Sequence, residues 1–562
     1  MRVLSGISGC ILGMLLVGCI ADQPPEVRAP NGRIKGSFMS TRLGRRIYAF
    51  RGVRYAEPPV GQLRFEPPVP KADYDAFDAS EEGPSCPALG ATLISEDCLR
   101  LNVYTTKLPV NDEPANRSVL VFFHPGGLYI YSGQSFRFGP QYILDKDIVL
   151  VTVNYRLASL GFFSTGDSLA PGNLGLKDQV VALRWIQRNI AAFGGDPASV
   201  TISGYSIGGV SVMLHMLSPM TKGLFHRAIM MSGSLSNLQP YPSEQTDLAK
   251  KQAELLGCPT DTTGSMMICL KSKPVENFTA TIPNFFEFYG DPMLIWKPVV
   301  EPEVRGVERF LAAQPLDLIR QGKIHPVPLI CGVNEDEVSN AVMGAAKAAE
   351  RGNDTIFRQI NDNWETLAPI SFLYERGTPR SRYVTKELRK FYLNDQPVGL
   401  GNYRSLGDIY ADSILMYPMY VSAQLLAEYS SMPVYFYKFT YQGRFSFSMW
   451  NDTAPYGVVH HDDLQYLFYM SFIFPFLNST DPEVAMVERY TSIVSHFAQT
   501  GEPLPQQQEE FRNVTWERYE PRRDNYLEIN LQPEMKRGFF TERLSIWKRL
   551  FPVNLRPSAT KH

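Results

Sequence analysis

Short, uninterrupted apolar runs recur along the first half of the chain and predict buried β-strands. Three of them cover residues 118–123, 148–153 and 200–203. Each is rich in β-branched or aromatic residues and none alternates with polar positions, which is typical of a sheet covered on both faces. Between the last two runs, apolar side chains recur at three-to-four spacing over residues 176–191, which predicts an amphipathic helix. This order of elements predicts an α/β architecture with a mixed, largely parallel sheet.

The first 21 residues have the pattern of a targeting segment. Arg2 is followed by an apolar, uncharged stretch that ends at Cys19, and small residues precede Asp22. The stretch is diluted with Gly and Ser and is only about long enough to span a bilayer, which favours a signal peptide that is removed on export. Residues 16–19 also resemble a bacterial lipoprotein cleavage box, so a lipid or membrane anchor is the alternative. We expect a signal peptide at residues 1–21 and a secreted, extracellular protein without stable membrane insertion.

Composition and charge exclude several other classes of protein. Of the 562 residues, 44% are hydrophobic, and 55 basic side chains against 57 acidic ones give a net charge of −2. The apolar content is that of a folded protein with a large core. A balanced charge supplies no basic footprint for nucleic acid, so no nucleic-acid partner is expected. Beyond residue 21 there is no transmembrane run, no internal repeat and no long linker.

If the protein is exported, its cysteines can form disulfides and its Asn-x-Ser/Thr sequons can be glycosylated. Proximity predicts disulfides between Cys86 and Cys98 and between Cys258 and Cys269, with Cys331 left as a buried thiol. The sequence contains no CxxC motif and no paired His/Cys spacing that would indicate a metal site. A sequon needs a surface position to carry glycan. The candidate glycosylation sites are Asn116, Asn277, Asn353, Asn451, Asn478 and Asn513.

The candidate nucleophile follows the third apolar run. Residues 204–208 read GYSIG, directly after the predicted strand at 200–203. A G-x-S-x-G sequence between a strand and a helix is typical of the nucleophile elbow of α/β-hydrolases. Its glycines permit a sharp turn, so that Ser206 projects from a strained tip and the next helix directs free N–H groups at a developing oxyanion. The motif alone also occurs by chance in a plain Gly/Ser turn, so its context decides.

That context resembles the type-B carboxylesterase family, which includes the cholinesterases. The similar blocks are residues 193–208 (FGGDPASVTISGYSIG), 96–104 (EDCLRLNVY), 55–61 (YAEPPVG), 63–65 (LRF), 154–157 (NYRL) and 171–179 (PGNLGLKDQ). The resemblance covers nearly all of the chain after the signal, and it looks most like the secreted insect esterases. It implies an α/β-hydrolase fold, with a large mixed and mostly parallel sheet flanked by helices, formed by a single domain over residues 22–562. It also implies a small carboxylic ester as substrate and no metal or organic cofactor, and it leaves the oligomeric state open.

The same resemblance implies the partners of the serine. The family's Gly-x-x-His pattern matches residues 457–460 and places the catalytic base on His460, with the adjacent His461 as the alternative. Residues 332–337 (GVNEDE) are similar to the loop whose final Glu is the triad acid, which selects Glu337. Without the resemblance, these acidic residues would be interpreted as a solvated loop. The chain order Ser206, Glu337, His460 is that of α/β-hydrolases.

Residues 124–127 (HPGG) look like the family's oxyanion loop. This implies that the N–H groups of Gly126, Gly127 and Ile207 form the oxyanion hole. Pro125 lacks an N–H, but the matching family position is not a donor. The chain departs from the family beside the serine, where Tyr205 replaces the usual Glu, His or Gln. Ile207 replaces a small residue, and its branched side chain is expected to crowd the turn.

These patterns together predict a secreted serine carboxylesterase that works through an acyl-enzyme on Ser206. Its activity should fall as His460 protonates, near pH 6–6.5 if the pKa of that residue is unshifted. The alternative from another class is a non-catalytic, esterase-like adhesion or binding protein. That branch typically loses the serine, whereas all three triad candidates are present here. Lipases and peptidases share this machinery and stay open as alternatives.

Overall fold

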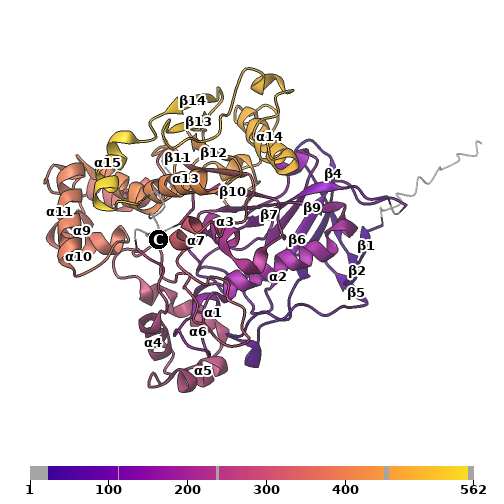
Figure 1. Ribbon diagram of the computed structural model, residues 1–562, viewed down its shortest axis with the longest axis horizontal. Helices are drawn as coiled ribbons and strands as arrows, with labels where there is room; N and C mark the ends of the chain where they lie inside the picture. The colour runs from indigo at the N-terminus through magenta and orange to yellow at the C-terminus, as the bar shows by residue number, and fades with distance from the viewer. Residues whose placement is uncertain (1–22, 112, 236–238, 449–454, 555–562) are drawn as a thin grey trace, which may run out of the picture.

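A large central sheet organises the structure, which is a computed structural model and describes residues 23–111, 113–235, 239–448 and 455–554 (Figure 1). The eleven strands of this sheet lie in the order β14-β13-β12-β11-β10-β9-β7-β8-β6-β4-β3, and a small second sheet has the order β1-β2-β5. The strands are β1 (Glu26–Ala29), β2 (Gly32–Lys35), β3 (Ser37–Ser40), β4 (Arg46–Arg54), β5 (Ala76–Asp78), β6 (Arg100–Thr105), β7 (Arg117–Phe123), β8 (Val149–Val153), β9 (Gly195–Tyr205), β10 (Arg227–Met231), β11 (Leu329–Asn334), β12 (Val434–Phe439), β13 (Asn525–Ile529) and β14 (Glu534–Arg537).

The pairing of these strands is mixed and mostly parallel. Every pairing from β8 through β7, β9, β10, β11 and β12 to β13 is parallel. The strands that flank this block, β14 at one edge and β6, β4 and β3 at the other, pair antiparallel. Parallel strands require crossover connections, and helices supply them.

The helices gather on both faces of the sheet and in two groups beyond it. Figure 1 shows α4, α5 and α6 together at the lower edge of the view, and α9, α10 and α11 together at its left. The helices are α1 (Ala158–Phe162), α2 (Leu174–Asn189), α3 (Ile207–Leu217), α4 (Thr246–Leu255), α5 (Thr263–Ser272), α6 (Val275–Thr281), α7 (Pro315–Arg320), α8 (Met343–Glu350), α9 (Thr355–Asp362), α10 (Trp364–Ser371), α11 (Pro379–Leu393), α12 (Tyr403–Ala411), α13 (Tyr417–Tyr429), α14 (Val484–Thr500) and α15 (Thr541–Leu550).

The two faces of the sheet explain why the predicted strands lack alternation. In β7, Val119, Val121 and Phe123 belong to one core cluster, together with side chains of α2, α3 and α13. Leu120 and Phe122 belong to a second cluster, together with side chains of α14. Both faces are therefore covered by helices, and successive side chains of one strand enter different cores.

The elements predicted from the sequence are present with shifted ends. The apolar runs lie in β7, β8 and β9, and β9 begins before its run, at Gly195. The predicted helix is α2, which begins two residues earlier than expected, at Leu174, and ends at Asn189. The chain then tightens into a short 3₁₀ turn, Ile190–Phe193, and the left-handed Gly194 ends it.

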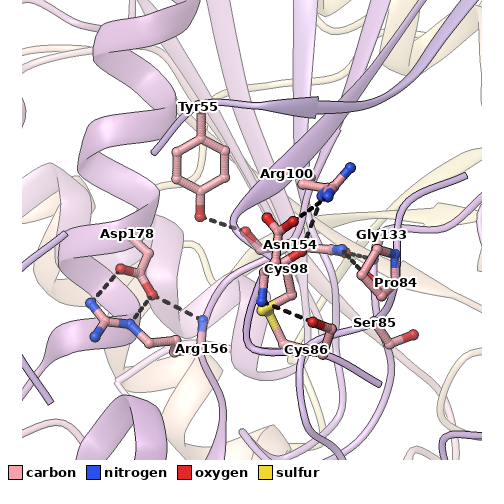
Figure 2. Close-up of a disulfide and its surroundings, with 12 residues drawn as sticks. Tyr55, Pro84, Ser85, Cys86, Cys98, Arg100, Gly133, Asn154, Arg156 and Asp178 are labelled. Carbon is pink, nitrogen blue, oxygen red and sulfur yellow. Dashed lines mark hydrogen bonds and ion pairs between the residues drawn. A yellow bond between two sulfur atoms is a disulfide. The ribbon is translucent and has the colours of Figure 1, made fainter. Parts of the chain in front are cut away.

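Three blocks of the family resemblance meet in a buried polar cluster near the first disulfide (Figure 2). The Tyr55 hydroxyl donates to the Asn154 carbonyl at 2.7 Å, and Asn154 Oδ1 accepts from the Gly133 N–H at 2.8 Å. Arg156 pairs with Asp178 of α2 at 2.7 Å, and their side chains are 3% and 0% exposed. These blocks hold the loop after β8 against α2, so their role is structural.

Five of the cysteines lie in the described part of the chain. Cys86 and Cys98 form one disulfide and Cys258 and Cys269 form a second, as their proximity predicts. Cys331 is a free thiol on β11, where burial raises its pKa and so keeps the unreactive protonated form.

Five of the six candidate glycosylation sites lie among the described residues. The sequon Asn451 and the predicted signal peptide at residues 1–21 lie outside the described residues. No helix within the described ranges is both long enough and apolar enough to cross a membrane. The other sequon asparagines are all exposed: Asn116, Asn277, Asn353, Asn478 and Asn513.

Candidate active site

Ser206 occupies a sharp turn between β9, which ends at Tyr205, and α3. Its backbone has φ 54° and ψ −122°, outside the regions that L-residues ordinarily adopt, and such strain is characteristic of functional sites. The turn is closely packed, because a Cβ on Gly204 would lie 2.2 Å from the Gly208 carbonyl oxygen. Just after β10, a Cβ on Gly233 would lie 1.7 Å from the Ser206 carbonyl oxygen. The glycines are therefore needed for the close approach of the backbone that presents Ser206.

His460 and Glu337 are joined by side-chain and backbone contacts. His460 Nδ1 lies 2.6 Å from Glu337 Oε2, and the His460 N–H donates to the Glu337 carbonyl at 2.8 Å. The other carboxyl oxygen, Oε1, accepts from the Asn334 N–H at 2.8 Å. Glu337 stands three residues after the end of β11, and His460 lies in the connection that follows β12. Since β11 and β12 are parallel neighbours, both residues lie beyond the carboxyl ends of these strands. The structure therefore pairs Glu337 with His460, and not with the alternative base, His461.

Burial favours the neutral form of each group in this pair. The Glu337 side chain is fully buried and that of His460 is 11% exposed. Burial disfavours the charged form of each group, so it raises the pKa of Glu337 and lowers the pKa of His460. A neutral His460 that directs its Nδ1 proton to Glu337 leaves the Nε2 lone pair free. That tautomer is the one a general base needs.

Tyr205 links the serine turn to the loop that carries His460. Its side chain is fully buried, and its hydroxyl accepts from the His461 N–H at 2.9 Å and from Asn334 Nδ2 at 3.2 Å. Asn334 Nδ2 also donates to the Val459 carbonyl at 2.8 Å and to Asp463 Oδ1 at 3.0 Å. The end of β9, the end of β11 and the histidine loop therefore share one polar network.

This network explains the conformation of His461. The residue has φ 79°, a left-handed conformation that costs a non-glycine residue roughly 1–2 kcal/mol. The hydrogen bond to Tyr205 and a stack of the two rings, with centroids 5.0 Å apart and planes at 30°, offset that cost. Sequence reasoning identified Tyr205 as a departure from the family but missed this role, because no local pattern connects residues 256 positions apart.

The loop after β7 is shaped by glycine. Gly126 has φ 118° and Gly127 has φ 59°, and a Cβ on Gly126 would lie 2.1 Å from the Ile130 carbonyl oxygen. The loop is anchored at its start, since the Tyr155 hydroxyl donates to the His124 carbonyl at 2.7 Å. Burial lowers the pKa of His124 to about 4, so its imidazole is neutral at physiological pH.

The serine, His460 and both loop glycines line one cavity of about 390 Å³. Much of its wall is apolar and comes from α8, α9, α12 and the π-helical turn Asp412–Met416. Ile207 contributes its side chain to the core and is not among the described cavity-lining residues. Within the described ranges, no cluster of His, Cys, Asp and Glu has a metal-binding arrangement.

The family model described as "Carboxylesterase family" matches residues 23–547 of this chain. The chain belongs to the carboxylesterase family. Relatives include Esterase FE4 from Myzus persicae, 36% identical over 515 residues that cover 88% of each chain. Juvenile hormone esterase from Tribolium castaneum is 33% identical over 524 residues, which cover 88% of this chain and 87% of that relative.

A solved structure confirms the fold of this esterase chain. The crystal structure of juvenile hormone esterase from Manduca sexta, with OTFP covalently attached, superposes with a TM-score of 0.82 at 27% sequence identity. The match covers 94% of this chain and all of that one. The predicted insect-type family, the α/β-hydrolase fold and the class of carboxylic ester hydrolase are therefore confirmed.

Proposed function

We propose that this esterase is a secreted serine hydrolase in which Ser206 is the nucleophile, His460 the general base and Glu337 the orienting acid. The observation that carries the proposal is the 2.6 Å contact between His460 Nδ1 and Glu337 Oε2, made beside a strained serine turn that opens into the same cavity. A serine hydroxyl becomes an effective nucleophile only when an oriented base takes its proton.

The reaction follows from this arrangement. His460 accepts the Ser206 proton as the oxygen attacks the ester carbonyl, and Glu337 stabilises the imidazolium that forms. The N–H groups of Gly126, Gly127 and Ile207 stabilise the tetrahedral oxyanion, where loss of one such donor typically costs about 2.7–4 kcal/mol. His460 then protonates the leaving alcohol, and water repeats the sequence to release the acid. This chemistry requires no metal or organic cofactor.

The test combines covalent labelling with turnover. An organophosphate should transfer its phosphoryl group to Ser206 and lose its leaving group, so the adduct has the mass of the phosphoryl group alone. The untreated protein should hydrolyse a small chromogenic ester. Ser206→Ala should lower kcat by about 10⁴-fold or more, whereas Ser545→Ala, at an exposed position of α15, should not change it. A folded protein that neither labels nor turns over would refute the esterase proposal and favour a non-catalytic binding protein.

Residues 22–562 are proposed to form one domain, since strands from β3 to β14 share a single sheet. Two disulfides and five exposed sequons support passage through an oxidising secretory compartment. Intact-mass measurement of the exported protein checks the secretion proposal. A mature N terminus near residue 22 and added glycan mass are expected, whereas a diacylated Cys19 would contradict simple secretion.

A further inference from the structure

The cavity at Ser206 contains a carboxyl group that the proposed reaction does not use. Asp291 is 4% exposed and lies among lining side chains that include Leu294 and Ile414. It is the only acid among the described residues that line the cavity, and none of those residues is Lys or Arg. A charged group in such surroundings is costly unless it is paired or hydrogen-bonded.

Asp291 is held in place through its backbone and one side-chain oxygen. The Asp291 N–H donates to the Phe288 carbonyl at 2.7 Å and closes a turn whose middle residues, Tyr289 and Gly290, have φ of 49° and 98°. Asp291 Oδ2 accepts from the hydroxyls of Ser371 at 2.5 Å and Tyr410 at 2.6 Å. These donors come from α10 and α12, so three separate segments fix the orientation of the carboxyl group.

The other oxygen, Oδ1, is left for a ligand. It accepts no hydrogen bond from the described residues. It is also not one of the fully buried polar atoms that lack a partner, so part of its surface is accessible to solvent. Asp291 lines the cavity, so this space is where a ligand donor would reach Oδ1. The structure therefore satisfies one carboxyl oxygen with two donors and leaves the second without any.

This carboxyl group lies near the reacting end of the cavity. A Cβ on Gly127 would lie 3.2 Å from the carbonyl oxygen of Met293, two residues after Asp291. Tyr129 lies on the loop of Gly127, and burial and the charge of Asp291 raise its pKa to about 12. A substrate whose ester group contacts Gly127 would therefore lie close to the loop that carries Asp291.

We propose that Asp291 is a substrate-binding residue and that the preferred substrates are carboxylic esters with a hydrogen-bond donor, a hydroxyl or an ammonium group, that reaches Oδ1. This rests on the proposed function, because the donor must belong to a molecule whose ester group lies at Ser206. A substrate without the donor would leave a buried carboxylate oxygen without a hydrogen bond, which is costly. The site should therefore discriminate strongly in favour of substrates that carry the donor.

The first arm of the test uses the wild-type protein and two series of esters. One series is nitrophenyl esters with acyl chains of four to ten carbons that end in methyl, hydroxyl or ammonium. The other is butyrate esters whose alcohol chains vary in the same way. At one chain length at least, a donor-bearing ester should exceed its methyl-terminated equivalent about 10-fold or more in kcat/KM. The better of hydroxyl and ammonium identifies the donor.

The second arm uses Asp291→Asn, which keeps the shape of the side chain. Ser371 and Tyr410 would hold the amide oxygen where Oδ2 lies, and the amide NH₂ would replace Oδ1 toward the cavity. The preference should then change from the donor-bearing ester to an ester with a terminal methoxy group. Asp362→Asn, at the exposed end of α9, should keep the wild-type preference.

Donor-bearing esters that never exceed their methyl-terminated equivalents in the wild type would overturn the inference, whatever the variant does. Failure of the proposed function has a different result. In that case no ester of either series would be hydrolysed, the methyl-terminated ones included, and an organophosphate would leave Ser206 unlabelled.

Discussion

Tyr205→Phe tests whether the buried network beside the serine positions His460. The change removes only the hydroxyl and keeps the ring that stacks on His461. The His461 N–H then lacks its acceptor, and Asn334 Nδ2 loses one of its three acceptors. Leaving one such group unsatisfied costs about 1–3 kcal/mol, so the free energy of unfolding should fall by that amount.

The effect on catalysis should exceed the effect on binding. The His460 loop keeps its bond to the Glu337 carbonyl, so it shifts rather than unfolds. We expect kcat to fall about 10-fold to 100-fold, equivalent to roughly 1.4–2.7 kcal/mol, with KM little changed. Steady-state kinetics and denaturant titration supply both quantities.

Tyr142→Phe is the matched control, because the buried Tyr142 hydroxyl also accepts a backbone N–H, that of Leu477 at 2.9 Å, outside the network around Tyr205. It should leave kcat near the wild-type value. If Tyr205→Phe lowers neither kcat nor the free energy of unfolding, the network does not position His460 and the reasoning is wrong.

Three further results are expected. Burial lowers the pKa of His460, so its imidazole stays neutral below the ordinary value of 6.5 and the acid limb of the kcat/KM profile should lie below that pH; a limb above pH 6.5 would contradict this. Gly126→Ala should lower kcat about 100-fold, because its Cβ would lie 2.1 Å from a backbone oxygen and the proposed oxyanion loop must move. Unchanged kinetics would exclude that loop from the reaction. Asp178→Asn should lower the free energy of unfolding by about 3–5 kcal/mol in thermal denaturation, because it leaves Arg156 buried without its ion-pair partner. Asp73→Asn, at an exposed ion pair, should lower it by less than about 1 kcal/mol, and equal losses would refute the argument from burial.

The sequence predicted the parts of this molecule that local patterns encode. The apolar runs identified β7, β8 and β9 because both faces of the sheet are covered, and the glycines identified the turn at Ser206 because the backbone approaches itself there. The pair formed by Glu337 and His460 needed the family resemblance, since nothing local distinguishes either residue from its polar neighbours. The roles of Tyr205 and Asp291 were beyond reach, because each depends on contacts with segments far away in the chain.

The cavity is assembled from two sources with separate duties. The loops after the parallel strands supply Ser206 and His460, with Glu337 buried against His460, while α8, α9 and α12 supply much of the surrounding wall. The two sources share few constraints, since a side chain on a wall helix can change size without altering the contact between His460 and Glu337. Duplicated copies of such a gene could therefore diverge in substrate range by substitutions in the helices alone. An engineer could redesign the same wall while the hydrolytic reaction stays intact.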